Sequence, residues 1–265
     1  MRIKKLLWLV APLSFLLACS ENAVTGKKSF SLISENQMQQ MAESQYDSFL
    51  KTSQVLNNKD AAMVKRIGSR ISTAITKYYT NLGKADVLDG YKWEYNLVDS
   101  KEVNAWCMPG GKIVVYTGIL PITQTEDALA VVMGHEIAHA VIQHGTSRMN
   151  EGFFTQLGGQ ALSIALATKS AQTQNLFLNA YGIGTQYGSA LPNSRKQELE
   201  ADKFGLLFSA LAGYDPRVAV GFWERMAKAS GGQKPAEFFS THPSDATRIA
   251  KIKEYLPEAM KSYKK

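Results

Sequence analysis

The sequence is poor in cysteine and histidine, with only two cysteines and four histidines in 265 residues. We expect one cysteine, Cys19, to be acylated, for the reason given below, which leaves Cys107 without an intramolecular disulfide partner even in an oxidising compartment. A disulfide scaffold is therefore excluded. The hydrophobic content of 45% is ordinary for a globular protein, which excludes disorder and requires a proper core.

The sequence also lacks a long apolar run in its two most apolar parts, Leu6 to Leu17 and Gly152 to Gly188. Neither part contains the about 20 consecutive apolar residues that are needed to span a bilayer. The first part is Leu6 to Leu17, which follows a basic start and ends in Leu16-Leu17-Ala18-Cys19. This pattern resembles a bacterial lipobox and predicts a lipoprotein signal peptide over 1–18, with lipid attachment at Cys19. The alternative is an ordinary secretory signal with an incidental cysteine.

The residue after Cys19 indicates the membrane to which such a lipoprotein would be sorted. Ser20, not Asp, follows the cysteine, which resembles an outer-membrane address in a Gram-negative bacterium. We therefore expect an outer-membrane protein, held in the membrane by its lipid anchor and facing the periplasm. A polar tether over 19–33 would then lead into a single domain over 34–265.

Charge of either sign is not in large excess. The full sequence has a net charge of +7, and cleavage before Cys19 would remove Arg2, Lys4 and Lys5 and leave +4. This modest balance gives no support to nucleic acid as a partner.

The pattern of apolar residues predicts a mainly helical α+β fold with a small sheet. A capping box at Ser34 opens the first expected helix, and β-like runs at 92–98 and 112–117 are joined through Asn104 to Gly111. The Gly- and Ala-rich part from Gly152 to Gly188 is interpreted as a packed helical hairpin, with contact to a lipid interface left open. Helices are expected at 34–50, 60–81, 125–149, 153–167, 173–187, 194–212, 216–229 and 244–255.

The segment His135-Glu136-Ile137-Ala138-His139 carries the chemistry. Two histidines four residues apart on a helix can both reach one metal ion. Glu136 can then take a proton from a metal-bound water, whose pKa the ion lowers to about 7. The motif predicts one zinc ion (Zn2+) per chain, with His135 and His139 as metal ligands and Glu136 as the catalytic base.

A stretch without possible metal-binding side chains narrows the choice of a third protein ligand. No Asp, Glu, His or Cys occurs from Gly152 to Gln197, and neither Glu151 nor His144 is placed to reach the metal comfortably. His144, five residues after His139, is about 140° round the helix from it.

The next acidic residues are Glu198, Glu200 and Asp202. Glu198 and Asp202 share a helix face, which suits a ligand and a carboxylate that orients a ligand histidine. Glu200 points about 160° away from Glu198 and is expected to be solvated. The alternative is that Glu198 and Asp202 are surface acids paired with neighbouring basic residues.

Taken together, five ordered blocks resemble metallopeptidase family forty-eight, the family of the HtpX and CAAX-prenyl-endopeptidase proteins, and are most similar to its periplasmic lipoprotein members. The resemblance covers about Leu50 to Leu256. The blocks are Asn104-Ala105, Pro109-Gly110-Gly111, the motif from His135 to His139, Glu198-x-x-Ala201-Asp202, and Thr241-His242-Pro243 with Arg248.

The resemblance implies a compact gluzincin fold with Glu198 as third metal ligand and an exposed edge strand that binds extended substrate. Pro109 to Val115 suits that strand, because a peptide could add to it through main-chain hydrogen bonds; a plain hairpin is the alternative. The substrate strand is thus assigned to Asn104, Ala105, Pro109, Gly110 and Gly111.

The resemblance also brings His242 and Arg248 to the catalytic centre. His242 could stabilise the oxyanion, occupy the open metal position and keep the enzyme latent, or only cap a helix. The expected function is a zinc metalloendopeptidase acting on unfolded or misfolded polypeptides, in quality control of envelope proteins. The alternative is a chaperone or assembly factor that acts with the outer-membrane assembly machinery.

Overall fold

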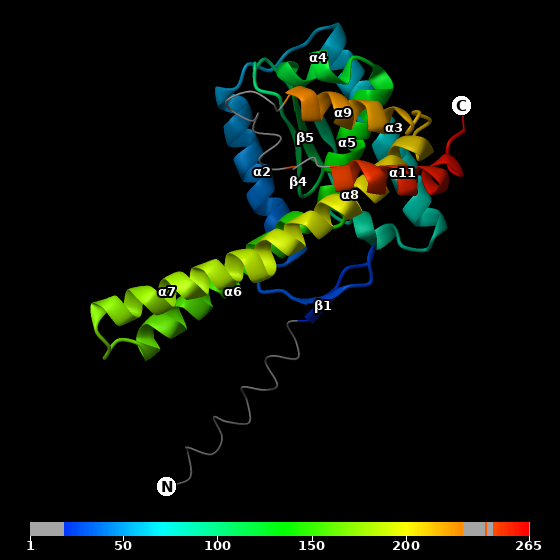
Figure 1. Cartoon of the computed structure of the whole chain (residues 1–265). Helices are drawn as coiled ribbons and strands as arrows, with labels where there is room; N and C mark the ends of the chain where they lie inside the picture. Colours follow the sequence, from blue (N-terminus) through cyan, green and yellow to red (C-terminus); the bar gives the residue numbers. More distant parts are fainter. Residues whose placement is uncertain (1–18, 230–241, 243–245, 265) are drawn as a thin grey trace.

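The computed structural model describes residues 19–229, 242 and 246–264. The predicted signal peptide, 1–18, lies outside the described residues. The described chain is mainly helical with a small three-stranded sheet (Figure 1), which confirms the expected α+β class.

The elements follow one another from the N-terminal hairpin to the C-terminal helix. The strands are β1 (Cys19–Glu21), β2 (Lys28–Phe30), β3 (Glu94–Val98), β4 (Ala105–Met108) and β5 (Lys112–Tyr116). The longer helices are α2 (Glu35–Thr52), α3 (Lys59–Asn81), α5 (Glu126–Val141), α6 (His144–Ala165), α7 (Ala171–Thr185), α8 (Leu191–Leu211), α9 (Val218–Ala229) and α11 (Ala246–Met260). Short helical segments are η1 (Ala85–Leu88), η2 (Thr117–Ile119), α4 (Leu120–Thr123) and η3 (Gln186–Ala190).

Helix starts follow the local chemistry of the sequence. The Ser34 side chain accepts a hydrogen bond from Gln37 N, and the Gln37 side chain returns to the Ser34 backbone, so the predicted capping box is present. Asn58 and Thr125 cap α3 and α5 through their side-chain oxygens.

The sheet has the order β3-β5-β4. β5 pairs in parallel with β3 and antiparallel with β4, so Lys112 to Tyr116 forms the central strand. The expectation that Pro109 to Val115 contains an exposed edge strand is therefore wrong. The strands at the two edges of the described sheet are β3 and β4, and the sequence pattern did not reveal β4 as a strand.

The segment predicted as a tether forms the β1–β2 hairpin, whose strands pair antiparallel. Asn22, in the turn of this hairpin, donates a hydrogen bond from its side chain to Ile142 O at 2.8 Å. After β2, the backbone N–H groups of Leu32 and Ile33 donate to Asn150 Oδ1. These bonds tie the start of the described chain to the base of α6.

Helix α5 forms the centre of the core, with every residue from Ala128 to Val141 buried. α8 crosses it at two glycines: an added Cβ on Gly134 would lie 2.7 Å from Gly205 O, and one on Gly205 would lie 2.7 Å from His135 N. Side chains larger than hydrogen at these positions would push the helices apart. This close approach brings the histidines of α5 against the carboxylates of α8.

The expected single helix over 125–149 is wrong, because the chain breaks after α5. Gln143 has a positive φ of 62°, a left-handed conformation that ends one helix before the next begins. From this break α6 turns away from the body and returns as α7, forming a hairpin that projects from the globular part (Figure 1). Within the described residues, no helix has both the length and the apolar character needed to cross a membrane.

Helix α8 also begins earlier than expected. It starts at Leu191, follows directly on η3, and has no side-chain cap. Ser194, the expected first residue of this helix, therefore lies inside it.

Candidate metal centre

Four side chains from three parts of the chain meet in the core. His135 and His139 of α5, Glu198 of α8 and His242 offer one ligand atom each, and these atoms all lie within 4.8 Å of one another. All four residues are buried. The structure thus brings together both predicted histidine ligands and the predicted third ligand, and places His242 with them.

The spacing of these atoms suits a tetrahedral ion. His135 Nε2 lies 3.1 Å from His139 Nε2 and 3.2 Å from His242 Nδ1. Glu198 Oε2 lies 3.3 Å from His135 Nε2 and 2.8 Å from His242 Nδ1. Ligands about 2.0–2.1 Å from a tetrahedral zinc ion are about 3.3–3.4 Å apart. The observed separations are close to that value, so the residues fit a zinc ion.

Two buried carboxylate oxygens point to the same fit. Glu136 Oε1 and Glu198 Oε1 take part in no hydrogen bond with the described residues, although His242 Nε2 lies 3.4 Å from the first and His139 Nε2 lies 3.3 Å from the second. Buried oxygens without a hydrogen bond are costly unless an ion, water or substrate satisfies them. The donor set of imidazole nitrogen and carboxylate oxygen is one that zinc prefers.

The electrostatic field of the cluster favours a positive charge. Burial lowers the pKa of His135, but hydrogen bonds to Asp202 and Glu198 outweigh it and raise this pKa to about 9. Burial, together with the charges of His135 and His242, holds the pKa of His139 well below its ordinary value. Burial would raise the pKa of Glu198, yet hydrogen bonds from the three histidines hold it far below its usual range. The carboxylate is therefore ionised and ready to bind a cation.

Asp202 lies behind His135, as predicted from the helix face that it shares with Glu198. Its Oδ1 is 3.0 Å from His135 Nδ1, so His135 can donate from Nδ1 and keep Nε2 for a metal. Arg248 donates to both oxygens of Asp202, at 2.7 Å and 2.8 Å, and its guanidinium lies 3.7 Å from the Trp223 ring centroid. Burial raises the pKa of Asp202, but the Arg248 charge and hydrogen bonds lower it to about 2.

Arg248 was predicted as a catalytic residue, and the structure gives it a different position. Its closest contacts are with Asp202, while its Nη1 is 3.4 Å from Glu198 Oε2. It holds the two carboxylates in place and is buried behind them. Arg248 is therefore a positioning residue.

His144 and Glu200 form a second support that the sequence did not reveal. His144 Nδ1 is 2.8 Å from His139 Nδ1, and His144 Nε2 is 3.3 Å from Glu200 Oε2. Glu200 also pairs with Lys27. The expectation that Glu200 is solvated is wrong, because the break at Gln143 turns α6 so that His144 reaches both α5 and α8.

The residues predicted as a substrate strand divide between β4 and its turn. Ala105 begins β4, Asn104 precedes it, and Pro109, Gly110 and Gly111 follow it. Within the described residues, β4 pairs with β5 on one side and with no strand on the other, an arrangement to which an extended peptide could add.

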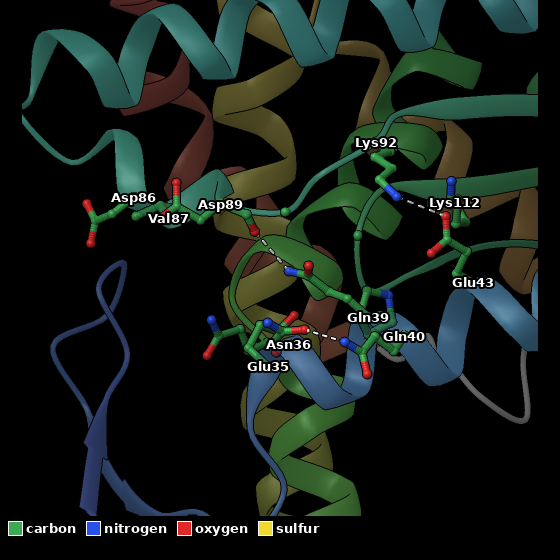
Figure 2. A pocket seen from close by; sticks show the side chains of 14 residues that line it. Glu35, Asn36, Gln39, Gln40, Glu43, Asp86, Val87, Asp89, Lys92 and Lys112 are labelled. Atoms are coloured by element: carbon green, nitrogen blue, oxygen red, sulfur yellow. Dashed lines mark hydrogen bonds and ion pairs between the residues drawn. The ribbon is translucent and has the colours of Figure 1, made fainter.

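A polar hollow of about 470 Å³ adjoins this turn (Figure 2). It lies between α2, the segment after η1 and the Pro109–Gly110 turn, and none of the four clustered ligands lines it. Across it, Gln39 donates from its side chain to Asp89 O at 3.0 Å, and Lys92 pairs with Glu43 at 3.3 Å. The hollow is thus distinct from the metal centre.

Curated proteins with similar sequences include metalloendopeptidases and a protease from several organisms. The chain is 42% identical over 171 residues to mitochondrial metalloendopeptidase OMA1 of Schizosaccharomyces pombe, covering 63% of this chain and 48% of that protein. It is 29% identical over 250 residues to the human mitochondrial metalloendopeptidase OMA1, covering 90% and 46%. It is 29% identical over 185 residues to the Escherichia coli beta-barrel assembly-enhancing protease, covering 66% and 38%. The chain spans about half or less of the length of these relatives.

These relatives correct one expectation. The OMA1 proteins of fission yeast, budding yeast, Arabidopsis thaliana and human are mitochondrial. This finding overturns the expected localisation as a lipid-anchored, periplasm-facing protein of a Gram-negative outer membrane.

A family model described as "Peptidase family M48" matches residues 61–256. The match includes the helix with both histidine ligands, the Glu198 to Asp202 segment and Arg248, which are the parts that the structure assembles around the cluster. This is the family that the sequence motifs resembled. The chain belongs to peptidase family M48.

Proposed function

We propose that this metallopeptidase is a zinc-dependent endopeptidase that hydrolyses peptide bonds in unfolded or misfolded polypeptides. The observation that carries the proposal is the buried cluster of His135, His139 and Glu198, with the Glu136 carboxylate beside it. His135, His139 and Glu198 would hold the zinc ion. A zinc ion in such a site polarises a carbonyl and lowers the pKa of a water.

Glu136 is suited to accept a proton at Oε1. This oxygen takes part in no hydrogen bond, and the residue is buried. Burial raises the pKa of Glu136, against the lowering effect of His242 and His135. A carboxylate with a raised pKa is a stronger base, and it can later return the proton to the leaving amine.

The edge of β4 supports a polypeptide as the substrate. An extended chain added to this edge would be held by its main chain, whatever its side chains. Only an unfolded segment presents a free main chain in this way, so we infer selection for unfolded or misfolded proteins.

Loss of activity in Glu136→Gln tests the proposal. This variant should retain about one zinc per chain, measured by atomic emission, while cleavage of an unfolded protein falls at least about a hundredfold, the usual scale of general acid–base catalysis. Glu224→Gln, on α9, serves as the matched control and should retain wild-type cleavage. Undiminished cleavage by Glu136→Gln would contradict the proposed role.

A second candidate is a chaperone or assembly factor with latent proteolysis. This alternative is favoured by the name of the Escherichia coli relative, which links a protease to beta-barrel assembly. Under this alternative, the assembly machinery would be a partner, and Glu136→Gln would preserve the biological function of the chain. Loss of that function together with cleavage would favour the endopeptidase.

A further inference from the structure

The hairpin of α6 and α7 exposes an unusual amount of apolar side chain. No residue of α6 after Asn150 is buried, and none of α7 is. Ile164 is 77% exposed, Leu176 67%, Ile183 59% and Tyr187 65%. The hairpin projects from the body (Figure 1), so the rest of the described chain does not cover these side chains.

The two helices contact each other along a line marked by Gly158 and Tyr181. Tyr181 Oη donates a hydrogen bond to Thr155 O at 3.0 Å, and an added Cβ on Gly158 would lie 2.2 Å from Tyr181 Oη. Positions elsewhere on each helix can be located relative to these two residues, at about 100° per residue.

Apolar residues occur at the same offsets from this line on both helices. We count from Gly158 on α6 and from Tyr181 on α7. On each helix, the residues five, four and one positions before this residue, and the residue six positions after it, lie about 40–140° to one side of the contact between the helices. Because the helices are antiparallel, equal offsets in the sequence place these residues on one common face of the hairpin. The face consists of Phe153, Phe154, Leu157 and Ile164 on α6, and Leu176, Phe177 and Ala180 on α7 with Tyr187 in η3. Ile183 extends it, two residues after Tyr181.

The opposite side is more polar, and its leucines near the contact line, Leu162 and Leu178, are half-buried. The residues two positions before and five positions after Gly158 are Gln156 and Ser163, both on α6. The corresponding residues around Tyr181 are Asn179 on α7 and Gln186 in η3. The hairpin is therefore amphipathic as a unit, although neither helix is long and apolar enough to cross a membrane.

The charge of the hairpin indicates what covers the apolar face. From Gly152 to Ser194 the only charged side chain is Lys169, which lies in the turn between α6 and α7. A protein surface that binds a partner in water is usually rimmed by charged groups. A neutral apolar face with aromatic residues and one lysine at its end is suited to the boundary between acyl chains and phosphate headgroups.

The position of the chain start favours the same occupant. β1 begins directly after the apolar sequence Leu6 to Leu17. The hydrogen bonds of Asn22 to Ile142 O and of Leu32 N to Asn150 Oδ1 hold this end beside the base of the hairpin. A membrane that receives the apolar segment would thus lie near the hairpin.

We propose that the α6–α7 hairpin docks on a lipid bilayer, with its Phe153–Leu157–Ile164 and Phe177–Ile183–Tyr187 face in the interfacial layer and its polar face toward water. The contact is hydrophobic and does not require anionic lipid. It joins the bilayer to the part of the molecule that carries His144 and Asn150.

Two tryptophan variants of the 265-residue chain, Phe177→Trp and Asn179→Trp, test this proposal. Both positions are exposed and on α7, and their separation of two residues, about 200°, places them on opposite faces of the helix. With phosphatidylcholine vesicles containing brominated lipid, the indole introduced at position 177 should shift to shorter emission wavelength and be quenched. The indole at position 179 should do neither. The four native tryptophans contribute the same background to both variants.

Changes in the same face and in the salt concentration make the test sharper. Leu157→Gln, Ile164→Gln and Leu176→Gln together, in the Phe177→Trp chain, should remove most of the quenching while circular dichroism stays unchanged, because all three side chains are exposed. Quenching should persist in about 1 M salt, where the Debye length is about 3 Å. Loss of quenching in salt would assign the contact to charge and overturn the proposal.

Two further outcomes would also overturn it. If neither introduced indole is quenched while the chain floats with the vesicles, only the N-terminal segment binds lipid. If the position-177 indole shifts equally without vesicles, in step with a concentration-dependent oligomer, the face is an interface with a second copy of the chain.

Discussion

His144 Nδ1 lies 2.8 Å from His139 Nδ1, although the two histidines belong to different helices. If His139 held a metal through Nε2, its proton would be on Nδ1 and would be donated to His144 Nδ1. His144 Nε2 can in turn donate to Glu200 Oε2, at 3.3 Å. The contact thus forms a chain from ligand histidine to histidine to carboxylate, and it orients His139 as Asp202 orients His135.

His144→Ala is expected to weaken zinc binding about 10- to 100-fold, the usual effect of removing a group that orients a metal ligand. Competition with a chromophoric chelator would measure this. Because the substitution also leaves a cavity, Glu200→Gln provides a second variant that keeps the side-chain shape and removes the acceptor charge. Unchanged zinc affinity in both variants would show that the histidine pair does not support the metal centre.

Arg248→Ala is expected to lower the free energy of unfolding by about 3–5 kcal/mol, because it leaves the buried Asp202 carboxylate without its bidentate partner. Zinc affinity should fall as well, since Asp202 orients His135. Chemical denaturation and chelator competition would measure the two effects. Arg217→Ala removes an exposed pair with Asp215 and should cost at most about 1 kcal/mol. Equal effects of both substitutions would contradict the positioning role.

Gly205→Ala tests the close crossing of α5 and α8. Its new Cβ would lie 2.7 Å from His135 N and 2.8 Å from His135 Cα, and overpacking of backbone in a core typically costs about 1–3 kcal/mol. The melting temperature should fall, and zinc affinity should fall with it, because the helices that carry His135 and Glu198 move apart. Gly182→Ala, in α7, has nothing within 4 Å of its new Cβ and should be neutral or stabilising by up to about 1 kcal/mol. A neutral Gly205→Ala would contradict the crossing.

Local chemistry in the sequence was enough to predict most helices and to point to three side chains of the candidate metal cluster, His135, His139 and Glu198. The capping box at Ser34 and the helical period of α3 depend on neighbouring residues only. Glu198 could be inferred because the preceding 46 residues contain no alternative ligand and because the family resemblance assigned the same residue.

Features set by tertiary contacts were not predictable in the same way. Gln143 adopts a positive φ without being glycine, so no turn residue marked the end of α5. The central position of β5 depends on a parallel pairing with β3 across intervening residues. The role of Glu200 depends on where His144 lies after that break, which helix geometry within α8 cannot show.

His242 is the residue for which two chemical roles give opposite outcomes. Its Nδ1 lies 3.2 Å from His135 Nε2 and 2.8 Å from Glu198 Oε2, within the group of ligand atoms. Its Nε2 faces Glu136 Oε1 at 3.4 Å. This arrangement favours occupation of the fourth metal position, where the imidazole would exclude water and substrate.

We therefore expect His242→Ala to raise kcat for an unstructured peptide, at saturating zinc, while zinc affinity falls modestly because one of four donors is lost. Stopped assays at fixed enzyme and metal content would measure both quantities. If His242 instead stabilises the oxyanion, the same substitution should lower kcat about 10²- to 10³-fold with unchanged zinc binding, since that interaction exists mainly in the transition state. His242→Gln separates the roles further, because an amide can donate a hydrogen bond to an oxyanion but is a poor zinc ligand: it should be active like His242→Ala if the histidine is a latch, and closer to wild type than His242→Ala if it is an oxyanion donor.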